Sequence, residues 1–245
     1  TKANAAEKAT SELLNSYTRT LRQASKNLND GISLINVAES GLNEQSGILI
    51  RLRGILTVAG GAIGQNERDT LQLEINTLRD EFNRIANSTE FNGQKLLDGS
   101  LAVSIATEQH VVITVGLDSS ASIQIDINSA VNLSSTATAA LGLDAVSATS
   151  FDDAADSLSI VEAALDTISG YRAGIGAIQN RFTRALSTLN VSIENLTAAF
   201  SVIKDANIAE ELADLTKQQL LVQSAAAMVG QANLVPEGVL LLLQQ

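Results

Sequence analysis

The stretch LNSYTRTLRQASKNLNDGISLINVAESGLNEQSGILIRLRGIL, residues 14–56, decides the fold. Aliphatic residues recur at every seventh position along it: Leu14, Leu21, Leu28, Ile35, Leu42, Leu49 and Leu56. Three places after each of them stand Tyr17, Ala24, Gly31, Ala38, Gln45, Leu52 and Ala59. A heptad with small residues in its second register is typical of a helix that packs closely against a neighbouring backbone. The pattern predicts one helix over residues 3–59, roughly 85 Å long at 1.5 Å per residue.

Glycines inside this predicted helix indicate that it is not stable alone. Gly31, Gly41, Gly47 and Gly54 each cost about 1 kcal/mol relative to Ala in an isolated helix. Packing against other helices must therefore hold the element together. The glycine-rich segment 59–64 then predicts its end.

A second helix is predicted to follow, with Asn66 as its N-cap and its end near Ser88. Its apolar residues alternate steps of four and three and so share one stripe: Leu71, Ile75, Leu78, Phe82 and Ile85. Because the connection is short, we expect this helix to fold back antiparallel on the first one.

The middle of the chain changes from a helical period to a period of two. Asn92-Gly93 is a favourable hairpin pair, and residues 101–105, 111–115 and 123–127 alternate as three short strands do. The Ser-, Ala- and Thr-rich stretch 128–150 reads as a loosely structured return connection anchored by Leu141 and Leu143.

Another long helix is predicted after Ser150, which with Asp153 resembles a capping box. Its heptad is equally regular: Val161, Ile168, Ile175, Phe182, Leu189, Leu196 and Ile203. We expect these residues and the first heptad to form one intrachain seam, the packing core of a rod. Near residues 204–207 the register weakens, and Asn207 with Glu210 offers a new cap.

A fourth apolar series, Ile208, Leu215, Val222 and Val229, precedes Pro236, where we expect that last helix to end. No apolar partner for it remains unassigned in the chain. Since each fully buried Leu or Val contributes about 1.5–3 kcal/mol, the series should pack against another subunit or against a segment that precedes residue 1. The four residues therefore predict assembly.

Composition excludes several classes of protein. The 245 residues contain no Cys, which removes thiolate metal sites, disulfides and cysteine nucleophiles. A net charge of -11 argues against binding to nucleic acid. The longest apolar run near the C-terminus, Val239 to Leu243, is too short to span a membrane, so we expect a soluble protein without membrane insertion. The start at Thr1 predicts a processed or truncated beginning.

No catalytic arrangement is visible in the sequence. His110 is the single histidine and is expected to have a surface or structural role. The adjacent Asp152 and Asp153 are better explained by the dipole at a helix start than by acid-base chemistry. We therefore expect no enzyme activity, no cofactor and no metal site.

Four motifs together resemble bacterial flagellin. They are LRQASKNLNDGISLINVAESGLNE (21–44), NSTEFNGQKLLDG (87–99), IGAIQNRFTRALSTLNVSIENLTAAFSVIKD (175–205) and QQLLVQSAAAMVGQANLVPEGVLLLL (218–243). The match covers nearly the whole chain, in the family's order. It implies a mainly α fold: an elongated rod of long antiparallel, heptad-packed helices with a small β-hairpin region and a C-terminal core helix.

The resemblance also implies a domain organisation. Residues 1–97, 98–150 and 151–205 would form the outer-core domain of the filament, and residues 206–245 the terminal helix of its inner core. We expect the middle to be too short for large outer domains, and, compared with the family's pattern, we expect the opening segment to be missing before Thr1. The implied function is a structural subunit of the extracellular flagellar filament, polymerising for motility.

Partners follow from the resemblance as expectations. They are other copies of the chain, an export chaperone, junction and cap proteins, and an innate immune receptor. The family's receptor contacts carry over to Arg51 and Ile55 in IRLRGI (50–55) and to Glu74 in LQLE (71–74), whereas Gly54 replaces an acidic residue. Two other hypotheses stay open: a hook-filament junction protein, and a surface protein that binds polysaccharide or host material through residues 98–150.

Overall fold

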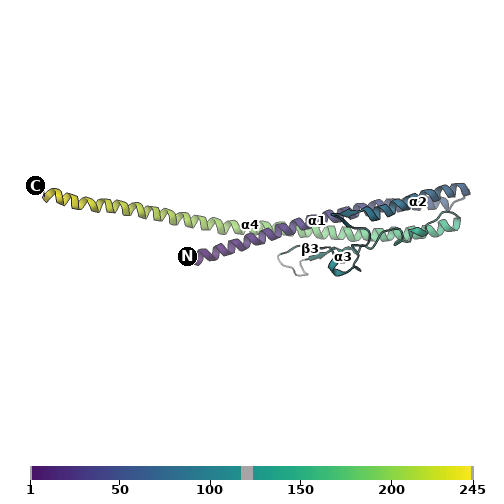
Figure 1. Cartoon of the computed structure of the whole chain (residues 1–245), viewed down its shortest axis with the longest axis horizontal. Coiled ribbons are helices and arrows are strands. Elements are labelled where there is room, and N and C mark those ends of the chain that lie inside the picture. The colour runs from purple at the N-terminus through teal and green to yellow at the C-terminus, as the bar shows by residue number, and fades with distance from the viewer. Residues whose placement is uncertain (1, 117–123, 244–245) are drawn as a thin grey trace. The chain divides into compact units, whose positions relative to one another are not determined.

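The computed structural model describes residues 2–116 and 124–243 (Figure 1). Contacts divide the chain into two compact units. Residues 20–192 form what we call the bundle unit, and residues 1–19 with 193–245 form the terminal unit. The helices are α1 (Lys2–Ala59), α2 (Gln65–Ser88), α3 (Ile127–Val131) and α4 (Phe151–Leu243). The strands are β1 (Glu90–Phe91), β2 (Gln94–Lys95), β3 (Val112–Thr114) and β4 (Gln124–Asp126).

Helix α1 presents its heptad residues to the core of the bundle unit. The first register is buried from Leu21 to Leu56, with at most 6% of any side chain exposed. In the second register Ala24, Ala38, Leu52 and Ala59 are buried, and so is the polar Gln45. Because apolar residues recur every seven positions, one stripe of the helix can be covered continuously by its neighbours.

Helix α2 runs antiparallel to α1. Gln45 Nε2 donates to the Phe82 carbonyl at 3.3 Å, and Arg51 reaches Glu74, so the residue numbers fall on one helix as they rise on the other. Ile75 and Phe82 are fully buried, Ile85 is nearly so, and Leu71 and Leu78 are half-buried. The predicted direction and the predicted stripe therefore agree with the structure.

The start of α2 differs from the prediction by two residues. Gly64, not Asn66, is the N-cap, and its N–H donates to the Glu67 carboxylate at 3.0 Å. The Arg68 guanidinium donates to the carbonyl of Ala59, the last residue of α1, and to that of Gly61 in the connection after it. A side-chain carboxylate one turn into the helix satisfies the first free N–H, so an Asn cap is not needed.

Helix α4 begins where the sequence predicts. Ser150 Oγ accepts the N–H of Asp153 at 3.1 Å, and Asp153 in turn accepts from Thr149 Oγ1 at 2.7 Å. The hydrogen bonds from Thr149 and Ser150 lower the pKa of Asp153 below its ordinary value. A negative charge is favoured there because it faces the positive end of the helix dipole.

Helices α4 and α1 are antiparallel within the bundle unit. Arg172 Nε donates to Glu39 Oε1 at 2.9 Å, and Gln179 Nε2 donates to Asn36 Oδ1 at 3.0 Å. On both sides of these two polar contacts and between them the α4 heptad is buried, with at most 7% exposed: Val161, Ile168, Ile175, Phe182 and Leu189.

The predicted break in α4 is wrong. The helix continues through residues 204–207 without a new cap, and Pro236 lies inside its assigned range instead of after its end. No Gly or Pro occurs between residues 177 and 229, so nothing in the backbone chemistry stops the helix there. One proline removes one helical hydrogen bond, which does not by itself terminate a long helix.

The β region consists of two small antiparallel pairs. β1 and β2 pair around Asn92-Gly93, whose φ angles of 51° and 79° are those of a tight hairpin turn. β3 pairs with β4 in the register Val112 to Asp126 and Ile113 to Ile125. Figure 1 shows β3 and α3 together on one side of the helices of the bundle unit.

The first predicted strand, 101–105, does not form. Only Leu101 pairs, as an isolated bridge with Leu133, because the chain turns directly after it. Of the third predicted strand, Ile123 lies outside the described residues. The return connection is better ordered than expected: Leu143 is fully buried as predicted and Leu141 is half-buried, but Leu133, Val146 and Ala148 are also buried.

Candidate assembly surface

The terminal unit exposes large apolar side chains along α4. Ile208, Leu215, Val222 and Val229, the series that predicted assembly, are between 52% and 68% exposed. Their spacing of seven residues places them along one stripe of the helix, which Leu212 joins at 61% exposed. In the described part of the chain these side chains are all more than half exposed, although Ile208 also lines a groove beside the start of α1.

Three further apolar residues of α4 lie outside that stripe and were missed from the sequence. Leu220, Leu221 and Met228 are 59%, 61% and 70% exposed. The signal for them is an absence of charge: from Gln218 to Pro236 the sequence contains no Asp, Glu, Lys or Arg. A helix that is apolar on more than one face is typical of one surrounded on several sides. A single heptad seam does not include these residues, because they lie on other faces of the helix.

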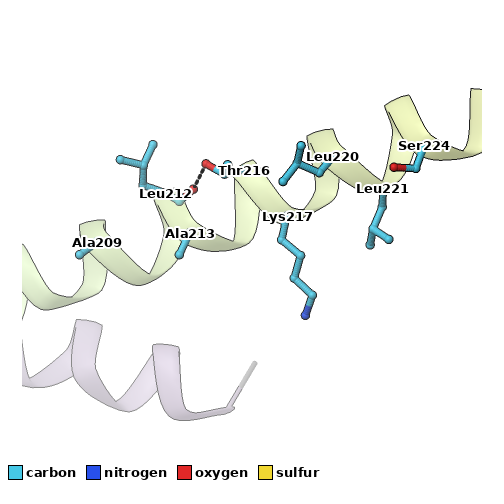
Figure 2. Close-up of a pocket in the computed structure, with 8 residues that line it drawn as sticks. All are labelled: Ala209, Leu212, Ala213, Thr216, Lys217, Leu220, Leu221 and Ser224. Atoms are coloured by element: carbon cyan, nitrogen blue, oxygen red, sulfur yellow. Dashed lines mark hydrogen bonds between the residues drawn. The ribbon is translucent and has the colours of Figure 1, made fainter. Parts of the chain in front are cut away.

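A shallow groove follows the helix surface (Figure 2). It is lined by Ala209, Leu212, Ala213, Thr216, Lys217, Leu220, Leu221 and Ser224. The Thr216 hydroxyl donates back to the Leu212 carbonyl at 2.8 Å, so its hydrogen-bonding capacity is partly used within the helix. Lys217 is the single charged side chain among these residues. The groove offers apolar contact area and no set of groups that could perform chemistry.

A second groove lies inside the terminal unit, between the start of α1 and α4. It is lined by Glu7, Lys8, Ser11, Glu12, Asn15, Phe200, Ile203, Lys204 and Ile208. The ammonium of Lys204 lies 5.6 Å from the centroid of the Phe200 ring. Leu14, Leu196 and Ile203, which belong to the intrachain heptads, are here only half-buried. The terminal unit is therefore packed less completely than the bundle unit.

The residues carried over as receptor contacts lie on α1 and α2 of the bundle unit. Arg51 donates from Nε and Nη2 to Glu74 Oε1, at 2.8 and 2.6 Å. Their side chains are 63% and 38% exposed, so a partner could reach both. Gly54 is also exposed.

Ile55 does not fit the expectation of an exposed contact residue. It is 3% exposed and belongs to the core of the bundle unit. The heptad explains why: Ile55 directly precedes Leu56 in the first register, and the stripe that faces the core is wide enough to include it.

The described residues offer no site of the other kinds considered from the sequence. Residues 2–116 and 124–243 hold no group of three or more His, Asp or Glu side chains that could bind a metal ion. Within the same ranges, no helix has both the length and the hydropathy to cross a lipid bilayer. Nδ1 of His110 lies 2.8 Å from Asp126 Oδ2.

Known proteins share both terminal regions of the chain. Residues 1–102 match the family described as bacterial flagellin N-terminal helical region, and residues 158–243 match bacterial flagellin C-terminal helical region. The flagellin of Bacillus subtilis (strain 168) is 38% identical over 263 residues, covering 98% of this chain and 86% of that protein. The flagellar filament 30.7 kDa core protein of Treponema maltophilum is 35% identical over 238 residues, covering 96% and 84%.

A solved structure agrees with these sequence matches. The crystal structure of Bacillus cereus flagellin superposes with a TM-score of 0.56 at 26% identity, covering 71% of this chain and 94% of that one. Two matched terminal regions and relatives above 30% identity over nearly the full length leave one assignment. The chain belongs to the bacterial flagellin family.

Proposed function

We propose that this flagellin polymerises by burying the exposed apolar faces of α4 in its terminal unit against neighbouring copies. The chain is a structural subunit of the bacterial flagellar filament, an extracellular assembly, and its family is a structural one. The observation that carries the proposal is the stretch 218–236, which has no charge and whose described apolar side chains are exposed.

Assembly energetics provide the mechanism. Each apolar side chain that is more than half exposed gains about 1–2 kcal/mol when a neighbour covers it. Because the apolar residues occupy more than one face of α4, a single partner helix would leave part of them in water. Several neighbours are needed, which is the situation inside a helical assembly of heterologous contacts that does not close into a ring.

The other two hypotheses are not favoured. Relatives that match nearly the whole chain are named flagellins and flagellar filament core proteins. No observation of residues 98–116 and 124–150 singles out a polysaccharide site. The filament subunit is therefore the function that we retain.

Other partners follow from the same surface chemistry. We propose that an export chaperone covers the α4 stripe before assembly, since an exposed apolar helix otherwise promotes aggregation. Junction and cap proteins would contact the same stripe at the two ends of a filament. For the immune receptor we retain Arg51 and Glu74 as proposed contacts and leave out Ile55, because its side chain is buried.

The test compares an apolar and a polar position on α4. Val222→Asp places a charge on the exposed stripe, and Gln218→Asp, one turn earlier, adds the same charge at a position that is already polar. We expect Val222→Asp to raise the critical concentration for polymerisation at least tenfold, measured by sedimentation and electron microscopy, and Gln218→Asp to change it less. Filaments of Val222→Asp at the wild-type critical concentration would refute the proposal.

A further inference from the structure

The one histidine of the chain has two hydrogen-bond acceptors, one at each ring nitrogen. His110 lies between the 3-10 turn Thr107–Gln109 and β3, and 5% of its side chain is exposed. Nδ1 lies 2.8 Å from Asp126 Oδ2, and Nε2 lies 3.3 Å from the Ile105 carbonyl oxygen. A neutral imidazole has one N–H, whereas the imidazolium has two. The geometry therefore fits the protonated ring.

The two acceptors are held to different degrees by the rest of the fold. Asp126 also accepts the Ser129 N–H at 3.2 Å and the Ser129 hydroxyl at 2.7 Å, which caps α3. Next to it, the fully buried Asn128 donates to the carbonyls of Ser100 and Ala102 and accepts the N–H of Val111. The corner between β4 and α3 is thus fixed independently of His110.

The Ile105 carbonyl is in a different position. It belongs to the turn that leads from Leu101 to Thr107, a segment without strand pairing after Leu101, whose start is held where the Val103 N–H donates to Asn132 Oδ1 at 3.0 Å. The longer bond from His110 Nε2 ties this turn to the buried ring. A neutral ring keeps its single N–H on the charged, closer acceptor, Asp126, because charge-assisted bonds are stronger. The bond to Ile105 is then lost.

The electrostatic surroundings of the ring also favour the protonated imidazolium. The hydrogen bond to Asp126 raises the pKa of His110 above its ordinary value, against the opposing effect of burial, and the backbone carbonyls of Ile105 and Val103 raise it further. Burial acts to raise the pKa of Asp126, but bonds from His110 and Ser129 outweigh it and hold the pKa below its ordinary value. Glu108, on the turn before His110, is exposed, and Asp118 lies outside the described residues.

We propose that His110 is a pH-operated latch that ties the segment 103–110 to the β4–α3 corner when protonated and releases the Ile105 end of that segment when neutral. The stabilisation by His110 is complete below its ordinary pKa of about 6.5 and is lost as the pH rises through the raised pKa of the folded state. The stabilisation by Asp126 is present above its ordinary pKa and is lost as the pH falls through the lowered pKa. The latch is therefore closed between the two.

Hydrogen exchange of the full-length monomer tests the latch. Protection factors, corrected for the intrinsic pH dependence of exchange, are compared at pH 6 and pH 9 for peptides covering 101–111 and 124–133. We expect the protection of 101–111 to fall about three- to tenfold at pH 9, the range of one intramolecular hydrogen bond. Protection of 124–133 should change little.

His110→Gln is the matched control, since it keeps a polar side chain but does not titrate between these pH values. In this variant the protection of residues 101–111 should be the same at both pH values. Equal pH dependence in the variant and the wild type would overturn the proposal. An NMR titration of the wild-type ring gives a second readout: a midpoint at or below about 6.5 would also overturn it.

Discussion

Two segments of α4 have the same heptad spacing, but the apolar side chains of one are buried and those of the other are exposed. In the bundle unit Val161, Ile168, Ile175 and Phe182 are at most 1% exposed, whereas in the terminal unit Ile208 and Val222 are 55% and 68% exposed. The spacing is seven residues in both. A heptad therefore indicates that an apolar stripe packs against a partner, but it does not indicate whether that partner belongs to the same chain.

The largest expected effect comes from placing a charge in each stripe. Ile168→Asp buries an unpaired carboxylate and should lower the free energy of unfolding of the monomer by about 4 kcal/mol. Val222→Asp, on the exposed stripe, should change it by less than about 0.5 kcal/mol. Urea denaturation of both monomers checks this, and a large loss in Val222→Asp would show that the stripe is already covered within the chain.

A smaller difference in monomer stability is expected between substitutions at two glycines of α1 inside the bundle unit. A Cβ at Gly41 would lie 2.8 Å from both Leu97 Cδ1 and Thr89 Oγ1, and Thr89 is held by its bond to the Ile85 carbonyl. Gly41→Ala should therefore destabilise the monomer by about 1–2 kcal/mol. Gly47 has nothing within 4 Å of the same position, so Gly47→Ala should stabilise it by about 0.5–1 kcal/mol.

Thermal unfolding of the two glycine variants measures this difference, with each compared with the wild type at one pH. Midpoints that move in the same direction would contradict the packing assigned to Gly41. The test also separates glycines that packing requires from glycines that packing tolerates, a distinction that residue type alone does not make.

The smallest effect is expected where both partners are exposed. Arg51→Ala breaks the ion pair with Glu74, and surface pairs of this kind contribute about 0–1 kcal/mol. Its monomer stability should change by less than about 1 kcal/mol, checked by urea denaturation at low and high salt. Loss of receptor activation by a stable Arg51→Ala monomer would favour a contact role, and unchanged activation would exclude one.

Local patterns predicted the elements whose chemistry is local. The end of α1 at Ala59, the turn at Asn92-Gly93 and the Ser150 cap each rest on residues within a few positions of one another. One error is itself local, since Glu67 caps the Gly64 N–H from three residues away and so moves the start of α2. The other arises where a remote residue decides: the pairing of Leu101 with Leu133 replaces a predicted strand.

The same distinction holds for the candidate sites. The series from Ile208 to Val229 was visible in the sequence as a stripe without a partner. The full width of the apolar surface became visible only in the structure, where Leu220 and Met228 are also exposed. Ile55 was carried over as a receptor contact from the resemblance alone, and its burial shows that the core-facing stripe is wider than two positions per heptad. The pairing of His110 with Asp126 joins residues whose distance in space no short-range pattern encodes.

By itself, the sequence determined that long helices flank a small β region, which of their positions are apolar, and that one apolar stripe exceeds what the chain can cover. These properties follow from periodicity and composition, which belong to each segment separately. Tertiary structure alone decided which stripes pack together and beside which glycines a neighbouring side chain occupies the space that a Cβ would need. It also decided that a single histidine lies within hydrogen-bond distance of two acceptors. Burial and charge pairing depend on groups brought together from distant parts of the chain, and only folding places them.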